Sequence, residues 1–164
     1  MFMGCEWGQT TEWDEAHSIN WDNIADSWGH EYHQGIQRLV RDLNFVYRDN
    51  SALFSQDNSP MGFQWLKGDD AAHNILAYTR WGADGQPLIA VVNLSGASQT
   101  NYRLGVPAAG TWEMIVNTDK KIYGGAGNPL ANEVQSQQLE WDNFEHSVEL
   151  HIPALSVQWY KLVR

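Results

Sequence analysis

Hydrophobic side chains recur with two different periods along this chain of 164 residues. Between residues 30 and 49 they recur every three or four positions, as on one face of an α-helix. These positions are Ile36, Leu39, Val40, Leu43, Val46 and Tyr47. The pattern predicts an amphipathic helix over residues 30–49. Only Gly35 argues against that helix, because glycine costs about 1 kcal/mol relative to alanine in a helix interior.

After about residue 55 the period changes to two, which is typical of β-strands. Residues 147–152 alternate between apolar and polar side chains, whereas residues 88–92 are apolar throughout, as in a central strand covered on both faces. Further candidate strands lie at residues 63–66, 75–81, 102–106, 112–116 and 157–163. We therefore predict a mainly β fold, in which an antiparallel β-sandwich of about seven or eight strands follows a Trp-rich loop and one amphipathic helix.

The first 28 residues have neither period and an unusual composition. They contain six acidic residues, four tryptophans and no Lys or Arg, and only the stretch from Met1 to Gly4 is short and apolar. The rest has the character of a long loop, and long structureless loops in compact domains are usually either functional or wrongly assigned as loops. A short apolar segment, a loop and a helix together make one β/α unit, the repeat of the eight-stranded β/α-barrel. A whole barrel needs about 250 residues, so the chain has room for its last unit only.

Charge and cysteine content exclude several classes of protein. Twenty Asp and Glu against ten Lys and Arg give a net charge of −10, which argues against a nucleic-acid partner. The sequence has no apolar run of about 18 residues, so we expect no membrane association, and its start does not resemble a signal peptide. The single cysteine, Cys5, excludes an internal disulfide and is expected to be a small buried residue. A cytoplasmic location is the natural expectation.

Several segments together resemble one enzyme family. They are FMGCEWGQ at residues 2–9, HQGIQRLVRDLN at 33–44, GFQW at 62–65, YRLGVP at 102–107 and IYGG at 122–125. In this order they resemble the C-terminal part of 1,4-α-glucan (glycogen) branching enzymes of the α-amylase superfamily. The resemblance covers essentially the whole chain, although Cys5 and Trp7 replace the commoner Gly and Phe. It implies that residues 1–8 correspond to the eighth barrel strand and residues 30–49 to the eighth barrel helix.

The same resemblance implies two domains and a division of labour. Residues 1–56 would be the remnant of the last β/α unit of a catalytic barrel, and residues 57–164 the C-terminal β-sandwich. The family transfers α-1,4-glucan segments to form α-1,6 branches, and its catalytic carboxylates lie on earlier barrel strands that precede residue 1. The chain has no Asn-His-Asp tripeptide, so it offers no catalytic residue and is predicted to be inactive alone. The sandwich would brace the barrel or contact glucan.

Two other function classes stay open beside this one. A Trp-rich β-sandwich also suits a stand-alone carbohydrate-binding module, and a purely structural domain needs no ligand at all. The resemblance favours the C-terminal part of a branching enzyme over the independent module. It does not decide between glucan contact and bracing alone.

The candidate substrate-binding residues are Glu6, Trp7, Trp13 and Trp21. An indole offers a broad apolar plane for the C–H face of a glucose ring, but each Trp could instead pack the loop against the barrel rim. Glu6 would order neighbouring loops more readily than touch sugar. The five remaining tryptophans, which lie in strand-like contexts, are expected to pack in or beside the core: Trp65, Trp81, Trp112, Trp141 and Trp159.

No cofactor or metal is expected. His30, Glu31 and His33 have histidines three residues apart, whereas the helical zinc motif needs them four apart. The partners implied by the resemblance are α-glucan or glycogen, through the parent enzyme. Because the other barrel strands are missing, residues 1–28 should be the least stable segment, and the exposed barrel remnant would favour a homo-oligomer.

Overall fold

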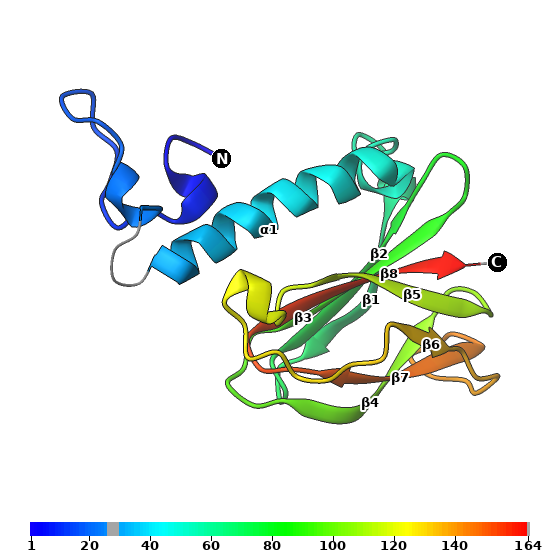
Figure 1. Cartoon of the computed structure of the whole chain (residues 1–164). Coiled ribbons are helices and arrows are strands. Elements are labelled where there is room, and N and C mark those ends of the chain that lie inside the picture. Colours follow the sequence, from blue (N-terminus) through cyan, green and yellow to red (C-terminus); the bar gives the residue numbers. More distant parts are fainter. Residues whose placement is uncertain (26–29, 164) are drawn as a thin grey trace.

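The computed structural model describes residues 1–25 and 30–163, so Trp28 lies outside the described residues. An N-terminal segment with two 3-10 turns, η1 (Cys5–Trp7) and η2 (Trp21–Asn23), leads to the helix α1 (His30–Asp49). A β-sandwich follows, and Figure 1 shows α1 crossing above it with the N-terminal segment beyond the start of the helix. Within the described residues, no helix has the length and apolar content needed to span a bilayer.

The sandwich consists of two antiparallel sheets. The larger sheet has six strands in the order β1-β2-β3-β8-β5-β6, and the smaller pairs β4 with β7. The strands are β1 (Phe63–Asp70), β2 (Ile75–Trp81), β3 (Pro87–Asn93), β4 (Gln99–Val106), β5 (Thr111–Asn117), β6 (Glu133–Gln135), β7 (His146–Ile152) and β8 (Ser156–Val163). The predicted mainly β fold, with one amphipathic helix ahead of it, is confirmed. Sequence patterning missed β6, which is three residues long and too short to show an alternation.

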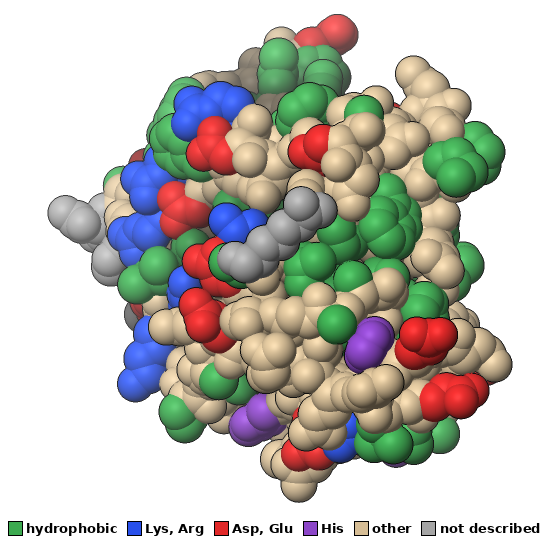
Figure 2. Space-filling model, turned by 90° about the vertical axis from the view of Figure 1, so that its right-hand side faces the viewer, with side chains coloured by type: hydrophobic (Ala, Val, Ile, Leu, Met, Phe, Trp, Pro, Cys, Tyr) green, Lys and Arg blue, Asp and Glu red, His purple; other side chains and the backbone are tan. Residues whose placement is uncertain are grey.

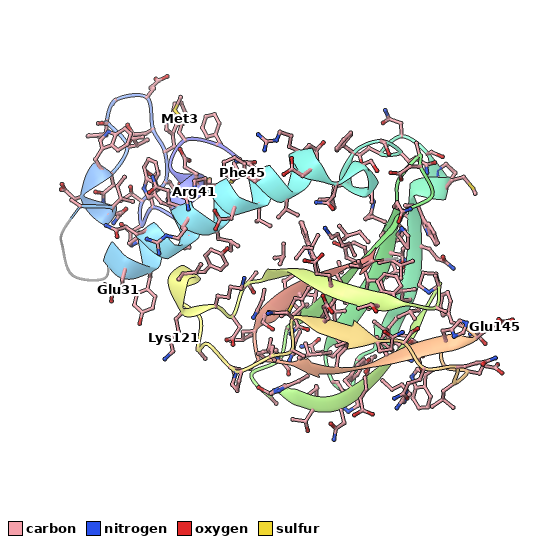
Figure 3. All side chains as sticks on the ribbon, turned by 45° about the vertical axis from the view of Figure 1, so that its right-hand side comes forward. Met3, Glu31, Arg41, Phe45, Lys121 and Glu145 are labelled. Atoms are coloured by element: carbon pink, nitrogen blue, oxygen red, sulfur yellow. The ribbon has the colours of Figure 1, made fainter. Side chains whose placement is uncertain are left out.

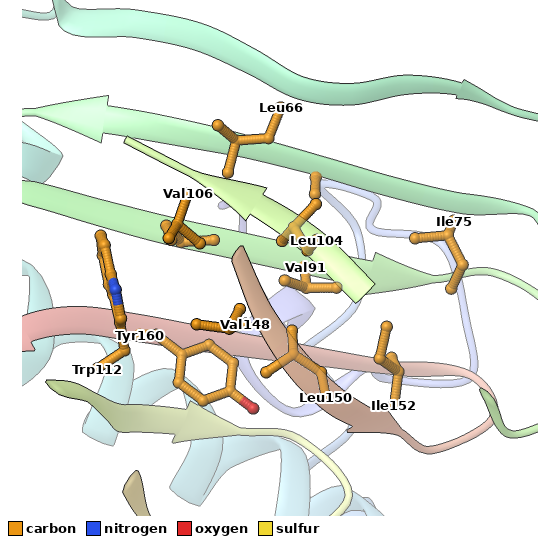
Figure 4. Close-up of a cluster of buried hydrophobic side chains, with 12 residues drawn as sticks. Leu66, Ile75, Val91, Leu104, Val106, Trp112, Val148, Leu150, Ile152 and Tyr160 are labelled. Atoms are coloured by element: carbon orange, nitrogen blue, oxygen red, sulfur yellow. The ribbon is translucent and has the colours of Figure 1, made fainter. Parts of the chain in front are cut away.

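The core fills the space between the two sheets (Figure 4). Leu104 of β4 and Leu150 of β7 face side chains such as Val91 and Tyr160 of the large sheet, and all four are almost completely buried. Trp112 of β5 is also fully buried there. Side chains that alternate along each strand thus place every second residue in one apolar layer, which is the origin of the period of two in the sequence.

β3 is the central strand that the unbroken apolar run predicted. It pairs with β2 on one side and β8 on the other, and six of its seven positions are buried. Ile89 and Val91 belong to the core between the sheets, whereas Leu88 and Ala90, which alternate with them, lie on the other face of the sheet and are each only 1% exposed.

We expect the amides of β3 to be among the slowest in the protein to exchange with solvent. Their hydrogen bonds lie inside the sheet and both faces of the strand are covered, so exchange requires global unfolding. Native-state hydrogen exchange followed by NMR measures this directly, with the edge strand β6 as the internal comparison. Equal protection of β3 and β6 would contradict the assignment.

Helix α1 docks on the sandwich through the glycine-rich loop after β5. The loop contains η5 (Lys121–Tyr123), and its Ile122 carbonyl accepts a hydrogen bond of 2.9 Å from the Arg38 guanidinium. The Tyr123 hydroxyl donates a hydrogen bond to Asp42 at 2.8 Å. Burial of the hydroxyl, and to a smaller extent its hydrogen bond to the Asp42 carboxylate, raise the pKa of Tyr123 to about 12. A Cβ atom on Gly35 would lie only 2.6 Å from the Tyr123 carbonyl carbon and oxygen. Gly35, which weakens the helix intrinsically, is therefore what permits this close contact.

A buried carboxylate shapes the same loop. Asp119 is 6% exposed, and its side chain accepts hydrogen bonds from the backbone N–H groups of Ala126 (3.0 Å) and Asn128 (2.7 Å). The Asn128 side-chain amide donates a third at 3.0 Å, and the Asp119 carbonyl accepts one from Gly127 N–H at 2.7 Å. Asp119 thus fixes the part of the loop that follows η5, at residues 126–128.

Some local expectations are wrong. Residues 1–8 contain the 3-10 turn η1 and no strand in this chain, where none of the described residues supplies the hydrogen-bonding neighbours that a parallel strand needs. Cys5 is consequently exposed. The correspondence of residues 1–8 to the eighth strand of a complete barrel stays a prediction. Of the tryptophans expected to be core or half-buried, Trp112 is fully buried, whereas Trp65 and Trp141 are 54% and 46% exposed and lie at the surface of the sandwich. An alternating pattern tells which residues share a face but not whether that face is covered.

Candidate functional site

The N-terminal segment forms an open hollow of about 560 Å³, which is lined by residues between Gln9 and Asp22. Trp13, Trp21, Glu12, Asp14 and His17 are among its lining residues. The segment folds over the start of α1, on the side away from the sandwich, where Figure 3 also shows Met3. Of the four predicted substrate-binding residues, the structure brings Trp13 and Trp21 together in this hollow, and leaves Glu6 and Trp7 out of its lining.

The buried ring of Trp7 packs against the ring of Trp21. The Trp7 side chain is 2% exposed, and its ring lies 5.1 Å from the Trp21 ring at 34° between the planes. Left-handed glycines at both ends of η1, Gly4 and Gly8, turn the chain so that Trp7 faces inward. The Trp7 carbonyl then accepts a 2.9 Å hydrogen bond from His33 Nδ1 of α1. Trp21 itself is 57% exposed, so its outer face is available to a ligand.

Trp13 forms the other aromatic wall. Its ring packs edge-on against Phe2 at 5.1 Å, and the side chain is 43% exposed. Backbone contacts shape the loop between the two rings: Gln9 Oε1 accepts from the N–H of Asn20 at 3.3 Å. Two partly exposed indoles in a polar hollow can take the apolar faces of sugar rings while neighbouring side chains bond the hydroxyls.

Asp14, one of the acidic residues that line the hollow, accepts several hydrogen bonds. Asp14 accepts hydrogen bonds from the His17 ring at 2.8 Å and from the N–H groups of Ala16 and His17. The His17 hydrogen bond and then the Ala16 N–H lower the pKa of Asp14 below its usual value. A lowered pKa favours the ionised carboxylate, whereas the general acid of a glycosidase pair needs a raised pKa.

Glu6 lies beside the hollow in η1, half-buried, and forms no hydrogen bond or ion pair within the described residues. Its role in glucan contact stays a prediction, as does that of Trp7. Sequence reasoning missed His33, whose ring fixes η1 to α1, and Gln34, whose Nε2 donates to the Ile24 carbonyl at 2.9 Å. The only feature of the sequence that could have indicated these roles is the position of both residues near the start of the predicted helix, next to the Trp-rich loop. Among the described residues, no three His, Cys, Asp or Glu side chains cluster as metal ligands.

Comparison with known proteins agrees with the fold and the sequence. Residues 65–163 match the family described as "Alpha amylase, C-terminal all-beta domain". The chain is 50% identical over 161 residues to the 1,4-alpha-glucan branching enzyme GlgB of Corynebacterium diphtheriae, covering 98% of this chain and 22% of that protein. It is 40% identical over 164 residues to the enzyme of the same name from Rhodococcus jostii, covering 100% and 22%.

Solved structures show the same fold at low identity. The catalytic module of the glycogen-degrading pneumococcal virulence factor SpuA aligns with a TM-score of 0.54 and 13% identity, covering 90% of this chain and 20% of that one. The Group B Streptococcus pullulanase SAP aligns with a TM-score of 0.52 and 13% identity, covering 89% and 18%.

The chain belongs to the α-amylase C-terminal all-β domain family. Its resemblance to the C-terminal region of glycogen branching enzymes is confirmed by the identity to GlgB proteins along nearly its full length. The chain spans about 22% of the length of those relatives.

Proposed function

We propose that this chain is the C-terminal part of a cytoplasmic 1,4-α-glucan branching enzyme, in which the parent protein transfers α-1,4-glucan segments to form α-1,6 branches in glycogen. One observation carries the proposal: 40–50% identity to such enzymes runs along 98–100% of this chain. The similarity begins in the N-terminal segment and continues through the sandwich. An independent carbohydrate-binding module would be expected to match over the sandwich alone.

Within the parent, residues 1–56 are the last β/α unit of the barrel and residues 57–164 are the bracing sandwich. The docking of α1 on η5 supports this division, because it fixes a barrel helix to the sandwich. In the parent, the other barrel strands cover the apolar side chains at the start of this segment, which are all more than half exposed in this chain: Met1, Phe2 and Met3. In the isolated chain the same apolar side chains favour association between two copies.

The N-terminal hollow contacts α-glucan in the parent. Trp13 and Trp21 supply apolar ring faces, Trp7 supports Trp21, and Glu6 orders the start of the loop. In an eight-stranded β/α-barrel, the loop after a strand lies on the face that holds the active site. The hollow therefore guides a glucan chain toward carboxylates that other parts of the parent supply.

The chain alone should show no branching or hydrolytic activity, because a retaining glycosyl transfer needs a carboxylate nucleophile and a carboxylic acid about 5 Å apart. Purified chain is incubated with amylose while the iodine spectrum and reducing ends are followed. The full-length C. diphtheriae relative is the positive control. Turnover that survives removal of contaminating amylases would show that the proposed division of labour is wrong.

Co-expression provides the positive test of the proposal. The C. diphtheriae enzyme without its last 22% should be inactive alone and regain measurable branching when this chain is expressed with it. A Trp21→Ala chain should still associate but restore less activity, because it lacks an exposed ring face in the hollow. Failure of the unsubstituted chain to bind the truncated relative, while the relative's own C-terminal part does, would count against the proposal.

A further inference from the structure

A small hollow of about 350 Å³ lies where the end of β5 meets the glycine-rich loop that carries η5. Its lining includes the polar residues Asn117, Lys120, Lys121 and Asn132 and the apolar residues Met114 and Leu130, and no Asp or Glu of the described residues lines it. Figure 3 shows Lys121 in this loop, below the N-terminal half of α1. The hollow shares no lining residue with the one between Gln9 and Asp22.

The two lysines of this hollow differ from the other basic residues because they have no partner. Six basic side chains form ion pairs with carboxylates: Arg41, Arg48, Lys67, Arg80, Arg103 and Lys161. Figure 2 shows one face of the molecule on which Lys and Arg side chains lie next to Asp and Glu. Within the described part of the chain, only Lys120 and Lys121 form neither an ion pair nor a hydrogen bond through their ammonium groups. Two unpaired ammonium groups beside one hollow repel each other, and an anion between them would relieve that repulsion.

A buried amide supplies a third donor to the same hollow. Asn117 is 5% exposed, and its Oδ1 accepts a hydrogen bond of 2.9 Å from the Asp119 N–H. Its Nδ2 forms no hydrogen bond within the described residues, although Asn117 lines the hollow. Buried amide donors are rarely left without an acceptor, so this group indicates a ligand with acceptor oxygens.

The loop also holds one of the lysines in position and neutralises the nearby acid. A Cβ atom on Gly127 would lie 2.5 Å from Cγ of Lys121, so the lysine stem lies directly on the Gly127 backbone. The carboxylate of the same loop, Asp119, is buried and takes its hydrogen bonds from Ala126 and Asn128. It therefore leaves both ammonium groups available to a ligand.

These donors fit a phosphate group. A phosphate monoester carries a charge of about −1.5 to −2 at pH 7 and three acceptor oxygens, which matches two ammonium groups and one amide donor. The volume of the hollow leaves room for a small organic group beside the phosphate. Met114 and Leu130 offer that group apolar surface, and the Asn132 amide can bond its hydroxyls.

We propose that this hollow binds the phosphate group of a small polar ligand and that the bound phosphate strengthens the contact between the sandwich and α1. It would join Asn117, at the end of β5, to Lys120 and Lys121. The next two residues, Ile122 and Tyr123, make the hydrogen bonds to α1. A ligand that binds only the closed loop stabilises this contact by mass action. The site does not depend on the function proposed above, because it rests on the charge and hydrogen bonding of this loop.

NMR titration of the unaltered chain at constant ionic strength tests the site. Glucose 6-phosphate or inorganic phosphate should saturably shift the side-chain amide signals of Asn117 and the backbone amide signals of Lys120 and Lys121. Equal affinities would assign the site to phosphate itself, and tighter binding of glucose 6-phosphate would assign it to a phosphorylated sugar; both results support a phosphate site. Signals that stay fixed at millimolar concentrations of both ligands, or equal shifts with unphosphorylated glucose, would overturn the proposal.

Variants show whether the two lysines carry the binding. Lys120→Gln combined with Lys121→Gln should weaken the phosphate affinity about tenfold or more, because two charge-assisted contacts are lost. Both side chains are exposed, so the fold should be retained. The matched control Lys161→Gln removes a lysine that is paired with Glu113 and should leave the affinity unchanged. Unaltered phosphate affinity in the double variant would contradict the proposed site.

Hydrogen exchange tests the link to α1. The N–H groups of Gly124 and Gly125 donate to the carbonyls of Lys121 and Lys120 at 3.0 and 3.2 Å, so their exchange reports opening of η5. Phosphate at ten times its Kd should slow this exchange about tenfold, because binding competes with opening. The Gly85 N–H in the β2–β3 hairpin should keep its rate. Unchanged exchange of Gly124 and Gly125 at saturating phosphate would overturn the proposed strengthening of the helix contact.

Discussion

Gly35→Ala should lower the free energy of unfolding by about 2 kcal/mol, within the range for overpacking a tight contact. In an exposed helix the same change would stabilise by about 1 kcal/mol. Here the new methyl group would lie 2.6 Å from the Tyr123 backbone, which cannot move aside as a flexible side chain can. The helix must therefore withdraw from η5, and the hydrogen bonds from Arg38 to Ile122 and from Tyr123 to Asp42 would lengthen or break.

Urea unfolding followed by circular dichroism measures the effect. Gly96→Ala is the matched control, because a Cβ atom there meets nothing within 4 Å and the backbone is not left-handed. It should change stability by less than about 0.5 kcal/mol, as for other surface substitutions. An unfolding midpoint for Gly35→Ala at or above that of the unsubstituted chain would show that the loop yields and that helix propensity decides.

The helix and most strands could be predicted because their signals are local. The apolar stripe of residues 30–49 and the alternation in β7 and β8 each reflect one face of one element, and the observed bounds follow them closely. The docking of α1 could not be predicted in this way. The reason for Gly35 lies in a loop far along the sequence, and nothing near Gly35 indicates that Tyr123 will lie against it.

The sequence-based expectations fail for segments whose structure depends on residues elsewhere in the chain that pair with them or cover them. Residues 1–8 correspond by resemblance to a barrel strand, but a strand has no stability without a paired edge, and this chain forms the 3-10 turn η1 there. Likewise, the alternation of β1 correctly places Phe63 and Trp65 on one face but does not reveal that this face is exposed.

The candidate site shows the same limit. The excess of tryptophan in the first 28 residues drew attention to the segment, but composition does not tell Trp13 and Trp21, which line the hollow, from Trp7, which does not. That Trp7 is buried beneath Trp21, and that His33 fixes the turn, depend on how the segment folds over α1.

Asp119→Ala is expected to be more damaging than Gly35→Ala, with a loss of about 3 kcal/mol. The substitution leaves the N–H groups of Ala126 and Asn128 and the Asn128 amide without their acceptor, and a hydrogen bond to a charged group contributes about 1.5–3 kcal/mol. The loop that carries η5 would open, so α1 would lose its contacts with the sandwich while the two sheets remain folded. Limited proteolysis should then cut between residues 119 and 128, where the unsubstituted chain resists.

Two controls make this result specific to the loop. Asp69→Ala removes an exposed carboxylate that lies 3.4 Å from Lys67, a surface pair whose loss should cost less than about 1 kcal/mol. Tyr123→Phe removes only the hydrogen bond to Asp42, and in the double variant with Asp119→Ala its effect should largely vanish, because the contact is already lost. If the two substitutions lower the free energy of unfolding additively, Asp119 stabilises the sandwich without holding η5 against α1. The position of the helix would then not depend on this buried carboxylate.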